Sequence, residues 1–172
     1  KLPPITVAMK TAGAKSFYKS ENGKQLYFDL ASKSYKSVPK NPNEIPLTSV
    51  KASGSVVKTN DSATLIDLGD GILCAEFHTK MNAIDTDLGM ILQEGVKLLN
   101  DGQFEGMVVG NQGQHFCAGA NIFVVLGEAM QENWKAIDEA VNAFQQINQA
   151  MRFCRKPIVS APHHYTLGGG TE

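Results

Sequence analysis

The sequence predicts an α/β fold, because strand-like and helix-like segments alternate along most of its length. Residues 63–77 read as two strands around a Leu-Gly-Asp-Gly turn, and residues 106–110 read as a strand buried on both faces. Two segments, 85–99 and 132–153, instead repeat their apolar residues at helical spacing. With a last strand in 157–162, the order of elements is ββαβαβ.

The first part of the chain reads as a small β structure. Aromatic and aliphatic residues flank Asn22-Gly23, which is a strong signal for a two-residue hairpin turn. A further short strand is expected at residues 34–38. The first part therefore differs in kind from the alternating pattern that follows it.

A proline-rich stretch separates the two parts. Residues 39–46 contain three prolines, which leave too few backbone donors for a regular helix or strand. We expect residues 1–46 to form a β-hairpin appendage with a Pro-rich linker, and residues 47–172 to form the main domain. Residues 47–58 are ambiguous, with room for one helical turn.

The two predicted helices differ in how clearly their ends are marked. Asp85 is a good N-cap for the first helix, which we expect to bury an apolar stripe and to stop at residues 100–102. Its stripe is Leu88, Ile91, Leu92 and Leu99. The second helix is stopped by Pro157, and we expect its stripe to be core. That stripe is Trp134, Ile137, Val141, Phe144, Met151 and Cys154.

The composition narrows the class of protein. With 42% hydrophobic and 19% charged residues, the chain can bury a core. No apolar run can cross a bilayer and no signal-peptide pattern is present, so we expect no membrane partner. Three widely spaced cysteines favour a reducing, cytoplasmic location.

Charge is divided unevenly along the chain. Residues 1–60 hold ten lysines against three acids, a net of +7, whereas the remainder holds six basic residues against fourteen acids, a net of −8. A basic segment could meet a nucleic acid or a nucleotide phosphate. However, the lysines are scattered among polar residues and no arginine accompanies them, which favours a solvated face. We therefore expect no nucleic-acid partner.

Two loops rich in small residues each follow a predicted strand. HFCAGANI follows the strand at 106–110, and TLGGGTE follows the last strand. The carboxyl ends of strands in α/β folds are where ligands bind, and a helix that begins there leaves its first N–H groups unpaired. Two such loops could converge on one oxygen atom as an oxyanion hole. Two tight strand-to-helix turns with close packing remain an equal alternative.

Other chemistries find less support in the residues. No C-x-x-C or H-x-x-x-H spacing accompanies the four histidines, so we expect no metal site. Cys117 lacks an evident base and is expected to pack as a small apolar residue. GGGTE does not complete the G-x-G-x-x-G fingerprint of a dinucleotide site.

The motifs resemble those of the crotonase (enoyl-CoA hydratase/isomerase) superfamily. GQHFCAGANI is similar to that family's oxyanion loop, and KPIVSAPHHYTLGGGTE is similar to its second loop. KMNAID resembles its coenzyme A turn. The segment AGAKSFYKSENGKQLYFDL resembles the stretch that leads into the hydratase half of bacterial multifunctional 3-hydroxyacyl-CoA dehydrogenases. The resemblance implies a crotonase-like ββα spiral.

The resemblance also implies roles for individual residues. Ala120 and Gly169 match the residues whose N–H groups hold the thioester oxygen, and Glu172 matches the first catalytic glutamate. Further positions match contacts with the acyl-CoA substrate. These are Lys80, Met81, Ala83, Ala118, Gly119, Asn121, Ile122 and Gly168.

The expected activity is hydration of 2-enoyl-CoA in fatty-acid β-oxidation. Isomerase or thioester hydrolase chemistry, or a non-catalytic scaffold, are the alternatives. The resemblance implies coenzyme A thioester as substrate, no cofactor on this segment, NAD on the dehydrogenase half, and a homo-oligomer.

Three positions depart from the family pattern. Asn121 replaces an aspartate, and His163-His164 replace Asn-Gly. The family's second glutamate would lie beyond Glu172, so we expect the spiral to be incomplete at its C-terminus and the 172-residue chain alone to be inactive.

Overall fold

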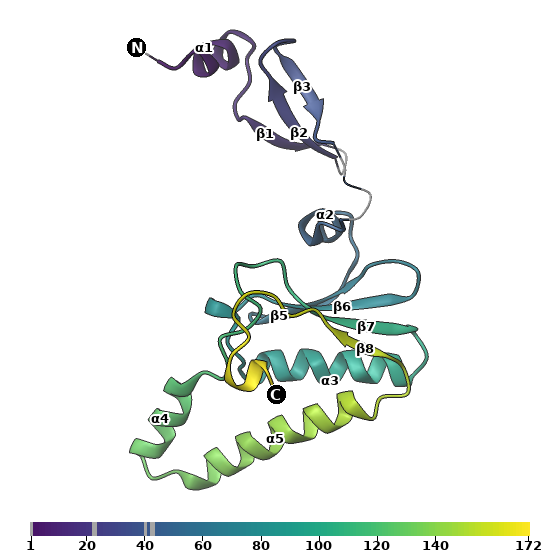
Figure 1. Cartoon of the computed structure of the whole chain (residues 1–172), viewed down its shortest axis with the longest axis vertical. Coiled ribbons are helices and arrows are strands. Elements are labelled where there is room, and N and C mark those ends of the chain that lie inside the picture. Colours follow the sequence, from purple (N-terminus) through teal and green to yellow (C-terminus); the bar gives the residue numbers. More distant parts are fainter. Residues whose placement is uncertain (1, 22–23, 40, 42–43) are drawn as a thin grey trace. The chain divides into compact units, whose positions relative to one another are not determined.

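The computed structural model describes residues 2–21, 24–39, 41 and 44–172, and it confirms the α/β class. Contacts divide the chain into two compact units, residues 1–54 and 55–172. This division falls after residue 54, whereas the sequence suggested a boundary after residue 46. Figure 1 labels most of the elements of both units.

The first unit contains two short helices and a three-stranded antiparallel sheet. Its elements are α1 (Pro4–Thr11), β1 (Tyr18–Glu21), β2 (Lys24–Asp29), β3 (Ser34–Ser37) and α2 (Leu47–Ala52). The expected hairpin strands and the short third strand are confirmed, and Glu21 pairs with Lys24. The Asn22-Gly23 turn itself lies outside the described residues.

Helix α1 was not predicted from the sequence. Pro4 stands at its first position, where a proline loses no hydrogen bond and already has a helical φ angle.

Within the sheet, the Phe28 side chain is buried and meets the edge of the Tyr35 ring. Some lysines of this unit are paired with acids: Lys36 contacts Asp29 at 2.5 Å and holds the pKa of that carboxyl well below its usual range.

The second unit is a five-stranded sheet with helices. Its strands are β4 (Val56–Thr59), β5 (Ala63–Asp67), β6 (Ile72–Phe77), β7 (Gly106–Gly110) and β8 (Ile158–Ser160). Its helices are α3 (Thr86–Asn100), α4 (Ile122–Met130), α5 (Trp134–Arg152) and the 3₁₀ turns η1 (Lys80–Asn82) and η2 (Gly168–Gly170). The strand order is β4-β5-β6-β7-β8, antiparallel from β4 to β6 and parallel from β6 to β8.

The second unit has three layers. Helix α3 packs on strands β5, β6 and β7, and α5 packs on α3, so that α3 lies between the sheet and α5 (Figure 1). The core lies between the sheet and α3, where Leu65, Leu73 and Leu99 are completely buried.

Helix α3 matches its prediction closely. Asp85 is its N-cap and accepts a hydrogen bond from the backbone N–H of Leu88, and all four predicted stripe residues are buried. Strands β7 and β8 also lie where the sequence placed them. The strand β4 was missed, because residues 56–59 lack an alternating pattern with a buried face.

The predicted core stripe of α5 is wrong in part. Trp134 is 64% exposed and Val141 is 51% exposed, whereas Ile147 is buried. Met151 and Cys154 are partly buried against the core, as expected. The helix contacts α3 along one side, and its first turns extend past that contact surface (Figure 1).

Within the part of the chain that the structure describes, we find no helix with the length and apolar character needed to span a bilayer.

Candidate functional site

The two loops after β7 and β8 lie side by side, as the sequence suggested. Because β7 and β8 are parallel neighbours, their carboxyl ends meet at the same edge of the sheet. The loops continue the pairing with three backbone hydrogen bonds of 3.0 Å, donated by the N–H groups of Phe116, Cys117 and Leu167. Their acceptors are the carbonyl oxygens of His163, Tyr165 and Cys117. The first loop, residues 111–121, is therefore tied in register to the second loop, residues 161–170.

Glycines allow the two loops to approach closely. Gly119 has a φ of +99°, and a β-carbon there would lie 3.1 Å from the carbonyl oxygen of Leu167 and 3.6 Å from the α-carbon of Gly168. A β-carbon on Gly170 would lie 2.6 Å from that of Cys117. Gly119 and Gly168 were expected to touch substrate, and the structure places both at the contact between the loops.

Two backbone donors at this contact are unpaired. Ile84 donates to the carbonyl of Gly119 and accepts from the N–H of Asn121, a parallel bridge that leaves the N–H of Ala120 pointing away from Ile84. Neither this N–H nor that of Gly169 donates to any group among the described residues. The β-carbon position of Gly169 lies 3.8 Å from the Ala120 nitrogen, so the two donors are neighbours.

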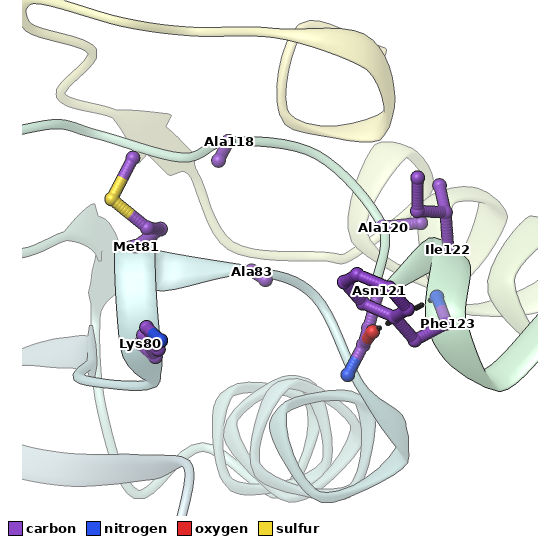
Figure 2. A pocket seen from close by; sticks show the side chains of 8 residues that line it. All are labelled: Lys80, Met81, Ala83, Ala118, Ala120, Asn121, Ile122 and Phe123. Carbon is purple, nitrogen blue, oxygen red and sulfur yellow. Dashed lines mark hydrogen bonds between the residues drawn. The ribbon is translucent and has the colours of Figure 1, made fainter.

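A pocket of about 360 Å³ adjoins the first loop. Its lining residues are Lys80, Met81, Ala83, Ala118, Ala120, Asn121, Ile122 and Phe123. Figure 2 shows Lys80 and Met81 at one side, the start of α4 at the other, and the small side chains of Ala83 and Ala118 between them. Seven of these eight residues were predicted from the sequence to lie at the substrate or the thioester oxygen. The structure thus brings the predicted residues of two distant motifs into one pocket.

The turn that forms one wall of the pocket has an unusual backbone. Met81 and Asn82 have φ angles of +59° and +51°, in the left-handed region. The buried Asn82 side chain donates to the carbonyl of His115 at 2.7 Å, and the Ala118 N–H donates to the Met81 carbonyl at 3.2 Å. These bonds fasten the wall to the first loop. Lys80 is the positively charged residue among those that line the pocket.

The other wall is the start of α4. Asn121 is the N-cap of this helix, and its side-chain oxygen accepts a hydrogen bond from the Phe123 N–H at 3.2 Å (Figure 2). Asparagine caps a helix as aspartate does, without the charge. Phe123 was missed in the sequence analysis, because the motif that indicated this loop ends at Ile122. Phe123 is 78% exposed and lines the pocket.

Glu172 follows the 3₁₀ turn η2, with its carboxylate exposed. Its backbone N–H lies 3.4 Å from the Gly168 carbonyl, which continues the turn, and its side chain is outside the set that lines the pocket. Gly169 lies in this turn and Glu172 follows it, so the carboxylate and one unpaired donor are close along the chain.

Cys117 packs as a small apolar residue, as expected. It is buried, its Sγ accepts a hydrogen bond from the Gly119 N–H at 3.3 Å, and burial raises the pKa of its thiol. A protonated, buried thiol is a poor nucleophile. Among the described residues, no group of three or more potential metal ligands comes together.

Comparison with known proteins agrees with the resemblance. The family model described as "Enoyl-CoA hydratase/isomerase" matches residues 73–172. A Bacillus subtilis protein named "Probable 3-hydroxyacyl-CoA dehydrogenase" is 38% identical over 171 residues, which are 99% of this chain and 21% of that protein. A Rickettsia prowazekii protein named "Putative fatty acid oxidation complex trifunctional enzyme" is 29% identical over 144 residues, 83% of this chain and 19% of that protein. The chain thus spans about a fifth of these relatives.

Solved structures support the same fold. The enoyl-CoA hydratase from Bacillus anthracis superposes with a TM-score of 0.56 at 20% identity, over 64% of this chain and 43% of that chain. The enoyl-CoA hydratase from Polaromonas sp. JS666 superposes with a TM-score of 0.55 at 17% identity, over 67% of this chain and 42% of that chain. These likenesses confirm a crotonase-like fold of which the chain spans less than half. With its fold, its paired loops and the match over residues 73–172, the chain belongs to the enoyl-CoA hydratase/isomerase family of the crotonase superfamily.

Proposed function

We propose that this chain carries the hydratase site of a fatty-acid β-oxidation protein, where water adds to the double bond of a 2-enoyl-CoA thioester. The observation that supports it most is the pair of unpaired N–H groups, at Ala120 and Gly169, beside a pocket. Two fixed backbone donors suit one oxygen atom that gains negative charge. A thioester carbonyl that is conjugated with a double bond supplies such an oxygen during hydration.

The reaction follows from that polarisation. With the carbonyl oxygen held by both N–H groups, electrons are drawn from the double bond and C3 becomes electrophilic. The carboxylate of Glu172 takes a proton from water as the water oxygen bonds to C3, and the protonated Glu172 then gives that proton to C2 as the enolate collapses to the thioester. The product is the 3-hydroxyacyl-CoA thioester, and no redox step is involved.

The pocket suits the carrier part of the substrate. The Lys80 ammonium can pair with a phosphate of coenzyme A, and the small side chains of Ala83 and Ala118 leave room for its thin, extended arm. Met81, Asn121 and Ile122 supply further contacts in this proposal, together with Phe123. Gly119 and Gly168 contribute by letting the loops approach each other.

The relatives' names suggest how the product is used. Hydration yields a 3-hydroxyacyl-CoA, which is the substrate named in "Probable 3-hydroxyacyl-CoA dehydrogenase". In this proposal the NAD site belongs to the dehydrogenase half of such a protein, outside this chain. We also expect the protein to be a cytoplasmic homo-oligomer. An acyl-CoA substrate links both steps.

Two other reactions would use the same polarised thioester. An isomerase would move the double bond between C2 and C3, and a thioester hydrolase would release free coenzyme A. A scaffold would need neither Glu172 nor unpaired donors, and the presence of both favours an enzyme. Assays for 3-enoyl-CoA isomerisation and for free thiol release separate the two reactions from hydration.

The test is Glu172→Gln in the natural full-length protein, assayed with a short 2-enoyl-CoA. The amide keeps the shape but cannot exchange the proton, so kcat should fall about 10²–10⁴-fold while the Kd for the thioester stays close to wild type. Glu132→Gln, which changes an exposed carboxylate before α5, is the matched control and should keep full activity. Near wild-type turnover by Glu172→Gln would eliminate the proposed role.

A further inference from the structure

Three aromatic rings meet where the two loops are paired. The His115 ring of the first loop stacks on the Tyr165 ring of the second, with centroids 4.3 Å apart and planes 15° apart. His164 meets the His115 ring edge-on at 5.6 Å and lies 6.3 Å from the Tyr165 ring. We propose that these rings, the loop clamp, are positioning residues that hold the two loops in register and so set the separation of the Ala120 and Gly169 donors. This inference rests on the proposed function.

The clamp sits at the beginning of the backbone ladder that leads to the donors. The N–H of Phe116, next to His115, donates to the His163 carbonyl, and the N–H of Cys117 donates to the Tyr165 carbonyl. Farther along, the Leu167 N–H donates to Cys117, and the unpaired N–H groups follow on both strands of the ladder. A shift at the rings would therefore move Ala120 relative to Gly169.

The flat face of His115, and not its nitrogen, accounts for its place in the clamp. Nδ1 of His115 is buried and meets no hydrogen-bond partner among the described residues. A buried unpaired nitrogen weakens the folded state, so this polar atom does not explain the side chain. The parallel stack on Tyr165 does, because offset aromatic pairs are favourable beyond their buried area. A phenylalanine at this position should keep the stack and remove the unpaired nitrogen.

The backbone conformation of His164 also supports the loop clamp. Its φ angle of +51° lies in the left-handed region, where a β-carbon is unfavourable. Such a conformation persists where surrounding contacts compensate for it. Here the compensating contacts are the two ring contacts to His115 and Tyr165.

The clamp also connects to the pocket wall. The His115 carbonyl accepts the hydrogen bond from the buried side chain of Asn82, and the His163 Nε2–H donates to the Gly113 carbonyl at 3.0 Å. Three segments, the turn at 80–82 and both loops, thus meet around His115. The Lys80 and Met81 side of the pocket stays anchored by Asn82 when the ring is removed, so we expect the clamp to affect turnover more than binding.

The first measurement detects opening of the paired loops in the absence of substrate. Amide hydrogen exchange at Cys117 and Leu167 is followed in the natural full-length protein and its variants. His115→Ala and Tyr165→Leu should speed exchange a few-fold to about tenfold, the change expected for losing one aromatic pair. His115→Phe should restore the wild-type rate. His78→Ala removes an imidazole whose Nε2 contacts Thr64 and is the matched control.

The second measurement detects the hydrogen bonds that the two backbone donors make to the thioester carbonyl. A chromophoric aryl-enoyl-CoA absorbs at longer wavelength when its carbonyl oxygen accepts hydrogen bonds. His115→Ala should lose part of this shift, and its kcat with an enoyl-CoA should fall about 10–100-fold, as for a small misplacement of reacting groups, with a much smaller change in KM. His115→Phe should recover both the shift and kcat, which a role for the imidazole in proton transfer would not allow.

The outcomes separate the two proposals. Unchanged exchange in His115→Ala and Tyr165→Leu overturns the clamp, whatever the activity. Faster exchange with an unaltered absorption shift and kcat also overturns it, because the rings would then not set the donors. A wild-type protein that binds the thioester with no shift refutes the proposed function instead, and the exchange rates still decide whether the rings hold the loops.

Discussion

Helices α3 and α5 have similar apolar spacing but different surroundings. In α3 the stripe formed by Leu88, Ile91, Leu92 and Leu99 is buried, because this helix lies between the sheet and α5. In α5 only one such residue, Ile147, is buried among the described residues, whereas Trp134 remains mostly exposed. Periodicity therefore predicts which residues share a face, and a second packed surface decides whether that face is buried.

Helix α4 extends the contrast. Its exposed apolar residues include Phe123, Val124, Leu126 and Met130. The helix starts at a loop that forms part of the pocket, and it packs against α5. Within the described second unit, the buried core therefore lies between the sheet and α3, whereas α4 buries no residue.

The largest effect should come from removing a buried α3 side chain. Leu99 is completely buried, so Leu99→Ala should lower the free energy of unfolding of the second unit by about 2–5 kcal/mol. Trp134→Ala, a larger truncation on exposed α5, should change it by less than about 1 kcal/mol. Urea unfolding followed by circular dichroism measures both. Equal losses of unfolding free energy in the two variants would show that burial does not distinguish α3 from α5.

A smaller effect should separate two helical glycines. A β-carbon on Gly95 of α3 would lie 2.6 Å from the Met107 sulfur, whereas one on Gly127 of α4 would meet nothing within 4 Å. Gly95→Ala should therefore destabilise by about 1–2 kcal/mol, since overpacking outweighs the better helix propensity. Gly127→Ala should stabilise by about 0.5–1 kcal/mol. The same urea experiment measures both variants, and stabilisation by Gly95→Ala would show that this core accommodates added volume.

Local signals in the sequence were sufficient for most of the fold. The cap at Asp85, the turn between β5 and β6 and the unalternating strand β7 each carry their own signal, and all three were found. Strand β4 and the exposure of Trp134 could not be predicted in this way, because they depend on neighbours elsewhere in the fold. Helix α1 had a readable signal, Pro4 at its first position, that went unused.

The site was predictable to a similar extent. The family motifs indicated seven of the eight residues that line the pocket, and Phe123 was missed. The close approach of Gly119 to Gly168 could not be predicted, because these glycines belong to two motifs far apart in the sequence. The same holds for the stack of His115 on Tyr165, which joins residues from different loops.

In the proposed mechanism, the N–H groups of Ala120 and Gly169 share one thioester oxygen. The most direct measurement is the carbonyl stretching frequency of a ¹³C-labelled 2-enoyl-CoA bound to the full-length Glu172→Gln variant, which should bind the thioester without turning it over. If the N–H groups of Ala120 and Gly169 hold the oxygen, the bound carbonyl should absorb at a lower frequency than the same thioester in water. A bound carbonyl with the frequency seen in water, or a higher one, would contradict the account.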